Sequence, residues 1–251
     1  MANYLSKNED LVNNPATRVP VCLCLDLSGS MGEIEEGDFT STGRTETVDG
    51  KVYNIVEGGI SRLDQLRAGL NLFFDAIRDD DTAVDAAEIA IVGFSNKAIK
   101  LLDFNHIDNQ AVPKMYADGS TAMGEGVNMA LQMLEERKQL YKENGIQYYQ
   151  PWLVIMTDGE NNGDKFEFKK AEDKINTLVK EGKLCVFALA IGKEADIDTL
   201  SRLTPKRRPL RLKGLRFKEF FTWLSKSVSR TSTSKIGDVV NLPPCDDWAT
   251  L

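Results

Sequence analysis

Histidine and long apolar runs are scarce in this chain, and their scarcity narrows the possible functions. Among the 251 residues there is one histidine, His106, in the polar segment Asp103-Phe104-Asn105-His106. A catalytic Ser/His/Asp or Cys/His arrangement needs further groups around the histidine, so we predict no such triad. No apolar run reaches the roughly 18 residues of a membrane span. Residues 1–10 lack the apolar core of a signal peptide, so none is expected.

Cysteine is also infrequent, with four residues at positions 22, 24, 185 and 245. Cys22 and Cys24 are two residues apart in a predicted strand, so their side chains face the same side. A disulfide between them would be strained, and a zinc site would lack further Cys or His ligands nearby. We therefore expect reduced thiols buried in a sheet, and a reducing compartment, which favours a cytoplasmic location.

Positive charge is in deficit. The chain carries 31 basic and 38 acidic side chains, and this net charge of −7 gives no general attraction to phosphate backbones. Nucleic acid is accordingly not an expected partner. Phosphate-binding loops are missing too, because there is no Gly-x-x-x-x-Gly-Lys-Ser/Thr segment and Gly124-Glu125-Gly126 lacks the third glycine of a dinucleotide fingerprint.

What the chain does contain is an alternation of apolar strands and amphipathic helices. Hydrophobic residues make up 42% of it, enough for a sizeable core. Strands are predicted at 19–25, 88–94, 98–104, 152–156, 184–191 and 209–213, and helices after 61, after 121, around 171–179, at 198–203 and at 217–228. Strands that are apolar throughout belong to parallel sheets covered on both faces. The expected fold is therefore α/β, with a doubly wound, mostly parallel central sheet flanked by helices.

The organisation predicted along the chain is a single domain with an insertion. Residues 1–16 are assigned to an N-terminal arm, 17–230 to the α/β domain and 231–251 to a C-terminal tail. Within the domain, the insertion 32–60 carries an Asp49-Gly50 pair between β-favouring residues, which predicts a β-hairpin. The helix that follows is expected to begin at Ser61, with Asp64 completing a capping box.

Carboxylates and hydroxyls gather at the ends of three predicted elements. They are Asp26, Ser28 and Ser30 after the first strand, Thr121 before a helix, and Asp158 after the strand at 152–156. Ligands in doubly wound sheets bind at the carboxyl ends of the strands, where these side chains are expected to lie. A set made only of oxygen donors suits a hard divalent cation.

These motifs resemble the metal-ion-dependent adhesion site of von Willebrand factor A domains. The resemblance covers about residues 17–229, and within the family the chain is most similar to bacterial cytosolic members, including those encoded near tellurium-resistance proteins. It implies that Ser28 and Ser30 ligate the cation directly, and that Thr121 does so directly or through water. Asp26 and Asp158 are implied to contact the ion through water molecules, or to contact the residues that ligate it directly.

The resemblance also implies what the site binds. The ion is expected to be Mg²⁺, with Mn²⁺ or Ca²⁺ as alternatives, and its remaining position is expected to take an Asp or Glu carboxylate from a partner protein. Hydroxyl ligands are neutral and leave the ion electrophilic, which agrees with the capture of an anion. We therefore expect a protein-binding module and not an enzyme, and its oligomeric state is not predicted.

Two other functions remain open at this point. A Mg²⁺-dependent phosphatase or other hydrolase would want a second acid near Asp26 and a lysine in the pocket, and Ser28 stands where that acid would help. A structural scaffold would use an ion, if any, only to brace loops. Ion-dependent capture of a partner would separate both from the adhesion hypothesis.

The insertion 32–60 is where the chain departs from this family. Many members run almost directly from the Asp-x-Ser-x-Ser turn into the first helix. Because the insertion must emerge at the rim of the site, we hypothesise that it forms part of the surface that contacts the partner. Its acids are interpreted as a solvated loop, with a self-blocking ligand as the alternative; they are Glu33, Glu35, Glu36 and Asp38.

Overall fold

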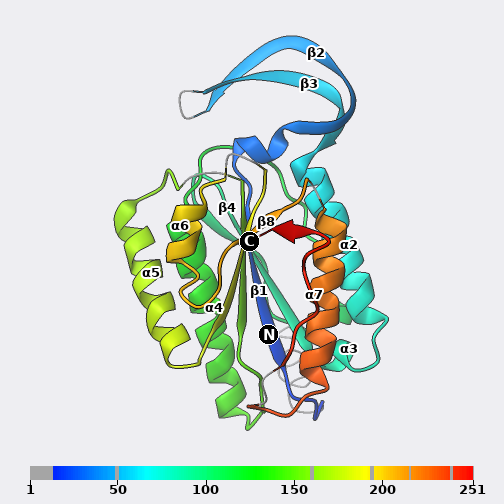
Figure 1. Cartoon of the computed structure of the whole chain (residues 1–251), viewed down its shortest axis with the longest axis vertical. Helices are drawn as coiled ribbons and strands as arrows, with labels where there is room; N and C mark the ends of the chain where they lie inside the picture. The colour runs from blue at the N-terminus through cyan, green and yellow to red at the C-terminus, as the bar shows by residue number, and fades with distance from the viewer. Residues whose placement is uncertain are drawn as a thin grey trace, which may run out of the picture.

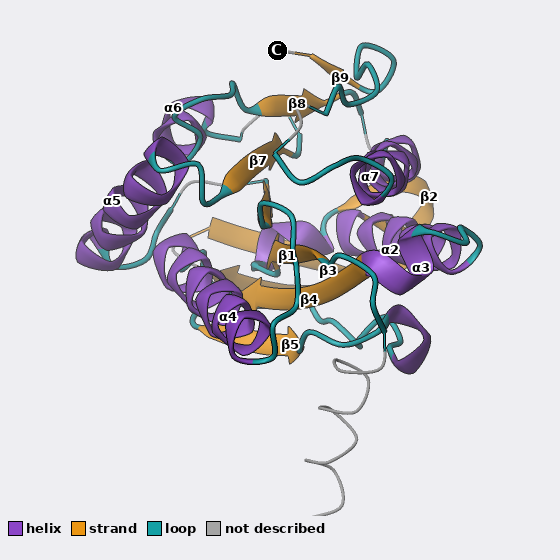
Figure 2. Ribbon diagram, turned by 90° about the horizontal axis from the view of Figure 1, so that it is seen from below, coloured by secondary structure: helices purple, strands orange, loops and turns teal. Residues whose placement is uncertain are grey.

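A seven-stranded sheet runs through the middle of the molecule, with helices on both of its faces (Figures 1 and 2). The computed structural model describes residues 14–48, 51–158, 161–192, 195–214, 216–237 and 240–250. In spatial order, the strands are β5 (Ala98–Leu102), β4 (Ala87–Phe94), β1 (Val19–Asp26), β6 (Trp152–Thr157), β7 (Cys185–Ala190), β8 (Leu210–Leu212) and β9 (Ala249–Thr250). The strands from β4 to β8 are parallel, and β5 and β9 pair antiparallel at the two edges. The predicted doubly wound, mostly parallel sheet is confirmed.

The helices form two layers that cover opposite faces of the sheet. One layer contains α2 (Arg62–Arg78), α3 (Ala83–Ala86) and α7 (Phe217–Ser232), and the other contains α4 (Met123–Glu143), α5 (Lys165–Lys180) and α6 (Ile197–Arg202). Two 3-10 turns, η1 (Gly29–Gly32) and η2 (Ile107–Asn109), lie in the connections. Within the described residues, none of the helices is long and apolar enough to cross a membrane.

Strand β1 shows how the two layers are joined into one core. All eight of its residues are buried, and alternate side chains point to opposite faces of the sheet. Leu23 packs with the layer that contains α2 and α7, whereas Cys22 and Cys24 pack with the layer that contains α4 and α5. Both cysteines are free thiols, as predicted, and burial raises the pKa of the Cys22 thiol well above its usual value.

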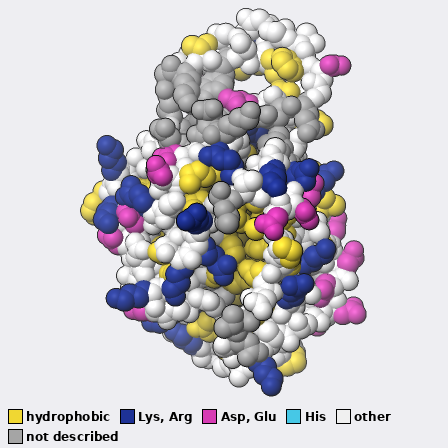
Figure 3. Space-filling view, in the orientation of Figure 1, with side chains coloured by type: hydrophobic (Ala, Val, Ile, Leu, Met, Phe, Trp, Pro, Cys, Tyr) yellow, Lys and Arg dark blue, Asp and Glu magenta, His cyan; other side chains and the backbone are white. Residues whose placement is uncertain are grey.

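The insertion is a β-hairpin that stands clear of the sheet, which confirms the predicted element. Strands β2 (Ile34–Val48) and β3 (Lys51–Ser61) form a separate antiparallel pair above the rest of the molecule (Figures 1 and 3). The predicted turn at Asp49-Gly50 lies outside the described residues. The hairpin leads into the predicted capping box, in which Ser61 Oγ accepts from Asp64 N at 3.1 Å and Asp64 Oδ2 accepts from Ser61 N at 3.2 Å.

The C-terminal stretch differs from the irregular tail that its sequence indicates. Within the described residues 240–250, strand β9 pairs antiparallel with β8, so the short strand β8 lies one place inside the edge of the sheet. Trp248 is buried, and its ring centroid lies 5.3 Å from that of Phe220 and 5.4 Å from that of Trp223. Burial of this large aromatic surface is the physical reason that the segment lies against α7.

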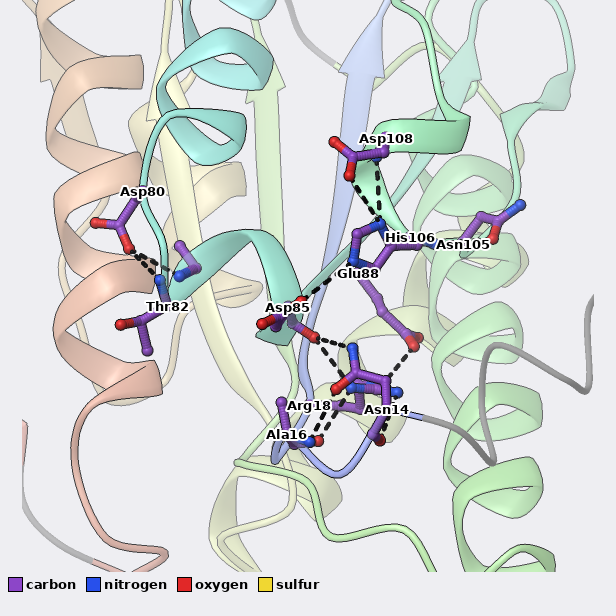
Figure 4. Close-up of polar contacts among 11 residues, drawn as sticks. Asn14, Ala16, Arg18, Asp80, Thr82, Asp85, Glu88, Asn105, His106 and Asp108 are labelled. Carbon is purple, nitrogen blue, oxygen red and sulfur yellow. Dashed lines mark hydrogen bonds and ion pairs between the residues drawn. The ribbon is translucent and has the colours of Figure 1, made fainter.

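A buried ion cluster centred on Glu88 holds the pole of the sheet where the parallel strands begin. Glu88 Oε1 lies 3.2 Å from Arg18 Nε, and Glu88 Oε2 accepts hydrogen bonds from Arg137 Nε at 2.5 Å and from the Tyr141 hydroxyl. Arg18 also donates to the main-chain oxygen of Asp85 at 3.0 Å (Figure 4). The cluster therefore fastens the start of β1 to β4 and to α4.

His106 belongs to this same pole. It forms an isolated β-bridge with Glu88, and its Nε2 lies 3.8 Å from Asp85 Oδ1 (Figure 4). Glu88 and Phe94 are six residue steps apart in β4, about 20 Å of strand, and Phe94 is the register partner of Asp26. The histidine therefore lies at the far end of the sheet from the hydroxyl cluster.

We expect the substitution Glu88→Gln to destabilise the fold strongly. Because it leaves Arg18 and Arg137 buried without their anion, the free energy of unfolding is expected to fall by about 3 kcal/mol or more. Urea unfolding followed by circular dichroism measures this loss. Glu143→Gln, at an exposed position of α4, the helix that carries Arg137, is the matched control and should leave the urea midpoint unchanged. Equal midpoints for both variants would contradict the assigned role.

Candidate metal centre

The candidate site lies at the crest of the sheet, the edge formed by the carboxyl ends of the parallel strands. Two loops are joined there by main-chain hydrogen bonds: Gly29 N donates to Gly119 O at 2.9 Å, and Asp118 N donates to Leu27 O at 2.9 Å. Gly119 has a φ of +75°, and a Cβ there would lie 2.3 Å from Asn96 Nδ2. The close approach of these loops therefore requires glycine at this position.

Asp26 is the most deeply buried member of the site. Its side chain is 0% exposed, its Oδ1 accepts from Ser28 N at 2.8 Å, and its Oδ2 accepts from Thr157 Oγ1 at 2.5 Å. Burial, and then the nearby charge of Asp158, raise the pKa of Asp26 to about 7, against the lowering effect of the hydrogen bonds from Thr157 and Ser28. Two carboxylates thus share a desolvated region with little compensating charge.

The predicted hydroxyls connect the two strand ends. Ser28 Oγ lies 3.1 Å from Ser30 Oγ, and Ser30 Oγ donates to Asp158 Oδ1 at 2.8 Å. Ser28 and Asp158 are buried, and Ser30 is partly buried. Four of the five predicted residues, Asp26, Ser28, Ser30 and Asp158, therefore form one continuous chain of hydrogen bonds at the ends of β1 and β6.

Thr121 joins this group through its backbone. It is 4% exposed, and its carbonyl oxygen accepts from Asn162 N at 3.1 Å and from Gly163 N at 3.2 Å. The same loop holds Gly119, whose carbonyl oxygen binds Gly29 N. Thr121 therefore lies in a loop that is hydrogen-bonded through its main chain to the loop after β1 and to the segment after β6. The role of its hydroxyl as an ion ligand stays a prediction.

Two residues that the sequence did not assign to the site also contact it. Thr157 supports Asp26 from the last position of β6. Arg62, the first residue of α2, places Nη1 2.8 Å from Asp158 Oδ2 and Nη2 2.9 Å from Glu33 Oε2. Thr157 directly precedes Asp158 in the Thr-Asp-Gly motif, which is a local signal. The Arg62 contact had no local signal, because it joins residues 96 positions apart.

Glu33 therefore pairs with a guanidinium, and its carboxylate is directed at Arg62. Asp38, another of the acids considered as a self-blocking ligand, is exposed on the hairpin. The side chains of Glu35 and Glu36, together with the predicted motif residues Gly159 and Glu160, lie outside what the structure describes. Among the described acids of the insertion, Glu33 is thus the one that reaches the site, and it does so through Arg62.

The residues present fit a hard divalent cation. The donors that converge at the crest are carboxylate and hydroxyl oxygens, which Mg²⁺ and Ca²⁺ prefer. The like charges of Asp26 and Asp158, buried together, are an environment that a cation would stabilise. Over the described residues there is no group of three or more His, Cys, Asp or Glu side chains arranged to hold a metal, so an ion at the crest would depend on the hydroxyls as well as on the carboxylates.

The fold and the site define this protein as an α/β domain with oxygen donors at the crest of its sheet. Comparison with known proteins identifies its family. The chain belongs to the von Willebrand factor type A domain family, whose model matches residues 21–217. Domains of this family typically bind ligands or partners. An uncharacterized protein of Synechocystis sp. is 25% identical over 194 residues, covering 74% of this chain. The chain spans 36% of the length of that curated relative.

Solved structures share the fold at low sequence identity. The pilus adhesin SpaC from Lactobacillus rhamnosus GG has a TM-score of 0.60 and 14% identity, covering 86% of this chain and 31% of its own. A von Willebrand factor type A protein from Catenulispora acidiphila has a TM-score of 0.57 and 16% identity, covering 86% and 43%. Proximal thread matrix protein 1 from the mussel byssus, with a zinc-occupied MIDAS motif, has a TM-score of 0.52 and 18% identity, covering 87% and 47%.

We expect Thr157→Val to destabilise the protein although it preserves the shape of the side chain. The substitution removes the hydroxyl that donates to the buried Asp26 carboxylate, which is expected to cost about 2 kcal/mol of unfolding free energy. Urea unfolding at neutral pH measures the change. Thr177→Val, which removes an exposed hydroxyl bonded to its own helix, is the control. A loss in Thr157→Val no larger than in this control would disprove the supporting role.

Proposed function

We propose that this chain is a divalent-cation-dependent protein-binding module in which Mg²⁺, or else Mn²⁺ or Ca²⁺, captures a carboxylate of a partner. The observation that carries the proposal is the chain of hydrogen bonds from Ser28 through Ser30 to Asp158, beside the buried Asp26. Membership of a family that typically binds ligands or partners supports it. The zinc-occupied MIDAS motif of the mussel protein supports a divalent ion in this kind of site.

In this proposal the hydroxyls of Ser28, Ser30 and Thr121 hold the ion, while Asp26 and Asp158 bind its water molecules and supply negative charge. The bound ion would supply a strong electrophilic centre for an anionic ligand. Because three of the protein donors are neutral, a partner Asp or Glu would complete the site favourably. Thr157 and Ser28 N keep Asp26 in a single orientation.

A binding module is favoured over an enzyme by the position of the single histidine. His106 lies at the opposite pole of the sheet from the crest. The basic side chain that contacts the proposed ion-binding residues is Arg62, and its guanidinium is bound by Asp158 and Glu33. The lysine that a phosphatase would want is therefore not provided by the described contacts of the site. The cytoplasmic location and the tellurium-resistance subtype stay predictions from the sequence.

The hairpin is proposed to form part of the partner surface. Strand β2 begins and β3 ends beside the site, because Arg62 N donates to Glu33 O at 3.1 Å. It carries exposed apolar side chains, with Phe39 57% and Val52 67% exposed. An exposed two-stranded ribbon buries little apolar surface of its own, and contact with a partner would bury more. Figure 3 shows Lys and Arg side chains interspersed with Asp and Glu side chains on the domain below it.

We expect the double substitution Ser28→Ala/Ser30→Ala to abolish binding of the ion. Loss of two direct oxygen ligands is expected to weaken Mg²⁺ affinity by about a hundredfold or more, measured by isothermal titration calorimetry. The fold should persist, because neither hydroxyl supports the core. Ser201→Ala, at an exposed position of α6, is the control. Unchanged Mg²⁺ affinity in the double variant would refute the site.

We expect replacement of residues 34–60 by a short Gly/Ser linker to separate ion binding from partner binding. The ends are close enough to join, since Glu33 O and Arg62 N are 3.1 Å apart. Mg²⁺ binding should persist, because the proposed ligands lie outside the deletion. Mg²⁺-dependent capture of proteins from a cell lysate should be lost, with a chelator-treated sample as the baseline. Capture of the same protein by the deletion variant would show that the hairpin is not part of the partner surface.

A further inference from the structure

The feature that the proposed function leaves unexplained is the guanidinium of Arg62 inside the site. Arg62 is the first residue of α2, directly after the hairpin, and its side chain is only 15% exposed. One arm of the guanidinium binds Asp158 Oδ2 at 2.8 Å and the other binds Glu33 Oε2 at 2.9 Å. A long basic side chain held in this way is a fixed positive charge within the group of proposed ion-binding residues.

The two oxygens of Asp158 are divided between two partners. Oδ1 accepts from the Ser30 hydroxyl and Oδ2 accepts from Arg62. The Asp158 side chain is 0% exposed, and a carboxylate buried to this degree is costly unless a positive charge is present. Arg62 supplies that charge. A divalent cation that binds through Asp158 therefore competes with a guanidinium that is already bound to the same carboxylate.

Arg62 offsets part of the negative charge at the site. Its guanidinium contacts the carboxylates of both Asp158 and Glu33. The same guanidinium repels an approaching cation, since unit charges a few ångströms apart interact appreciably even near a protein surface. Arg62 therefore both neutralises the site and lowers its affinity for the ion.

Arg62 also lies at the base of the hairpin. Its main-chain N–H donates to Glu33 O, and its side chain binds the carboxylate of the same residue. Glu33 immediately precedes β2, and Arg62 immediately follows β3. The two residues that close the hairpin are thus tied directly to Asp158, a proposed ion-binding residue at the end of β6.

We propose that Arg62 is a built-in counter-cation that competes with the divalent ion for Asp158 and links occupancy of the site to the base of the hairpin. This inference rests on the proposed function. If ion binding weakens the Arg62–Asp158 pair, the pair must weaken ion binding by the same free energy. The ion loosens Arg62 from Asp158, and the closing contact between Glu33 and Arg62 changes with it. The base of the hairpin, which faces the partner, therefore differs between the ion-bound and the ion-free protein.

The first test is calorimetric titration of the full chain with Mg²⁺ alone. We expect Arg62→Gln to bind Mg²⁺ about tenfold more tightly than the wild type, because a repelling charge is removed. Arg62→Lys keeps the charge and should restore an affinity close to that of the wild type. Arg67→Gln is the matched control, because it removes the same charge from an exposed ion pair with Asp64 on the same helix; its affinity should be unchanged.

The second test is hydrogen exchange at the Arg62 amide, which reports the base of the hairpin without reference to any activity. In the wild type, saturating Mg²⁺ should accelerate exchange of this amide. In Arg62→Gln exchange should already be fast without the ion and should not respond to it. Far-UV circular dichroism establishes that each variant is folded. If Arg62→Gln does not fold, Glu33→Gln provides the test: Arg62 then pairs with Asp158 alone, and Mg²⁺ affinity should fall.

The outcomes separate this inference from the proposed function. A wild type that binds no Mg²⁺ overturns both. A wild type that binds Mg²⁺ through the two serines, together with an Arg62→Gln variant of equal or weaker affinity, overturns the counter-cation role and leaves the proposed function standing. Exchange at the Arg62 amide that ignores Mg²⁺ in the wild type overturns the link to the hairpin.

Discussion

Two carboxylates buried beside each other at the ends of adjacent strands are the constraint on which this structure depends. Asp26 ends β1 and Asp158 follows β6, and these strands are hydrogen-bonded neighbours in the sheet. Desolvated like charges are unfavourable, as the raised pKa of Asp26 shows. The hydroxyls of Ser30 and Thr157, the amide of Ser28 and the guanidinium of Arg62 all donate to these acids. The crest is organised around relieving that repulsion.

The two poles of the sheet handle buried charge in opposite ways. At one pole a single anion, Glu88, is bound by two arginines and a tyrosine, so it is fully paired. At the crest the Asp158 carboxylate contacts one guanidinium, which is itself shared with Glu33, whereas the Asp26 carboxylate accepts hydrogen bonds from the neutral Thr157 hydroxyl and Ser28 amide. A fully paired cluster adds rigidity, whereas a cluster with excess negative charge has capacity for a cation. This contrast supports a stabilising role for the Glu88 pole and the proposed ion binding at the crest.

Local patterns were sufficient to predict the elements of the fold. The buried strand β1, the hairpin and the capping box of Ser61 with Asp64 were all predicted, because each depends on residues close together in the chain. Contacts between distant segments were not predicted. Trp248 is one example, since its position in the sequence does not reveal that Phe220 and Trp223 leave a place for its ring.

The same division holds at the site. The sequence by itself determined which oxygens are available and that they follow strands or precede a helix, because motifs such as Asp26-x-Ser28-x-Ser30 are contiguous. Only the tertiary structure decided that Arg62 reaches Asp158, because this contact depends on the hairpin returning the chain to the rim before α2 begins. Chain neighbours specify the local turn, whereas the pairing of distant charges depends on how strands, helices and insertion pack together.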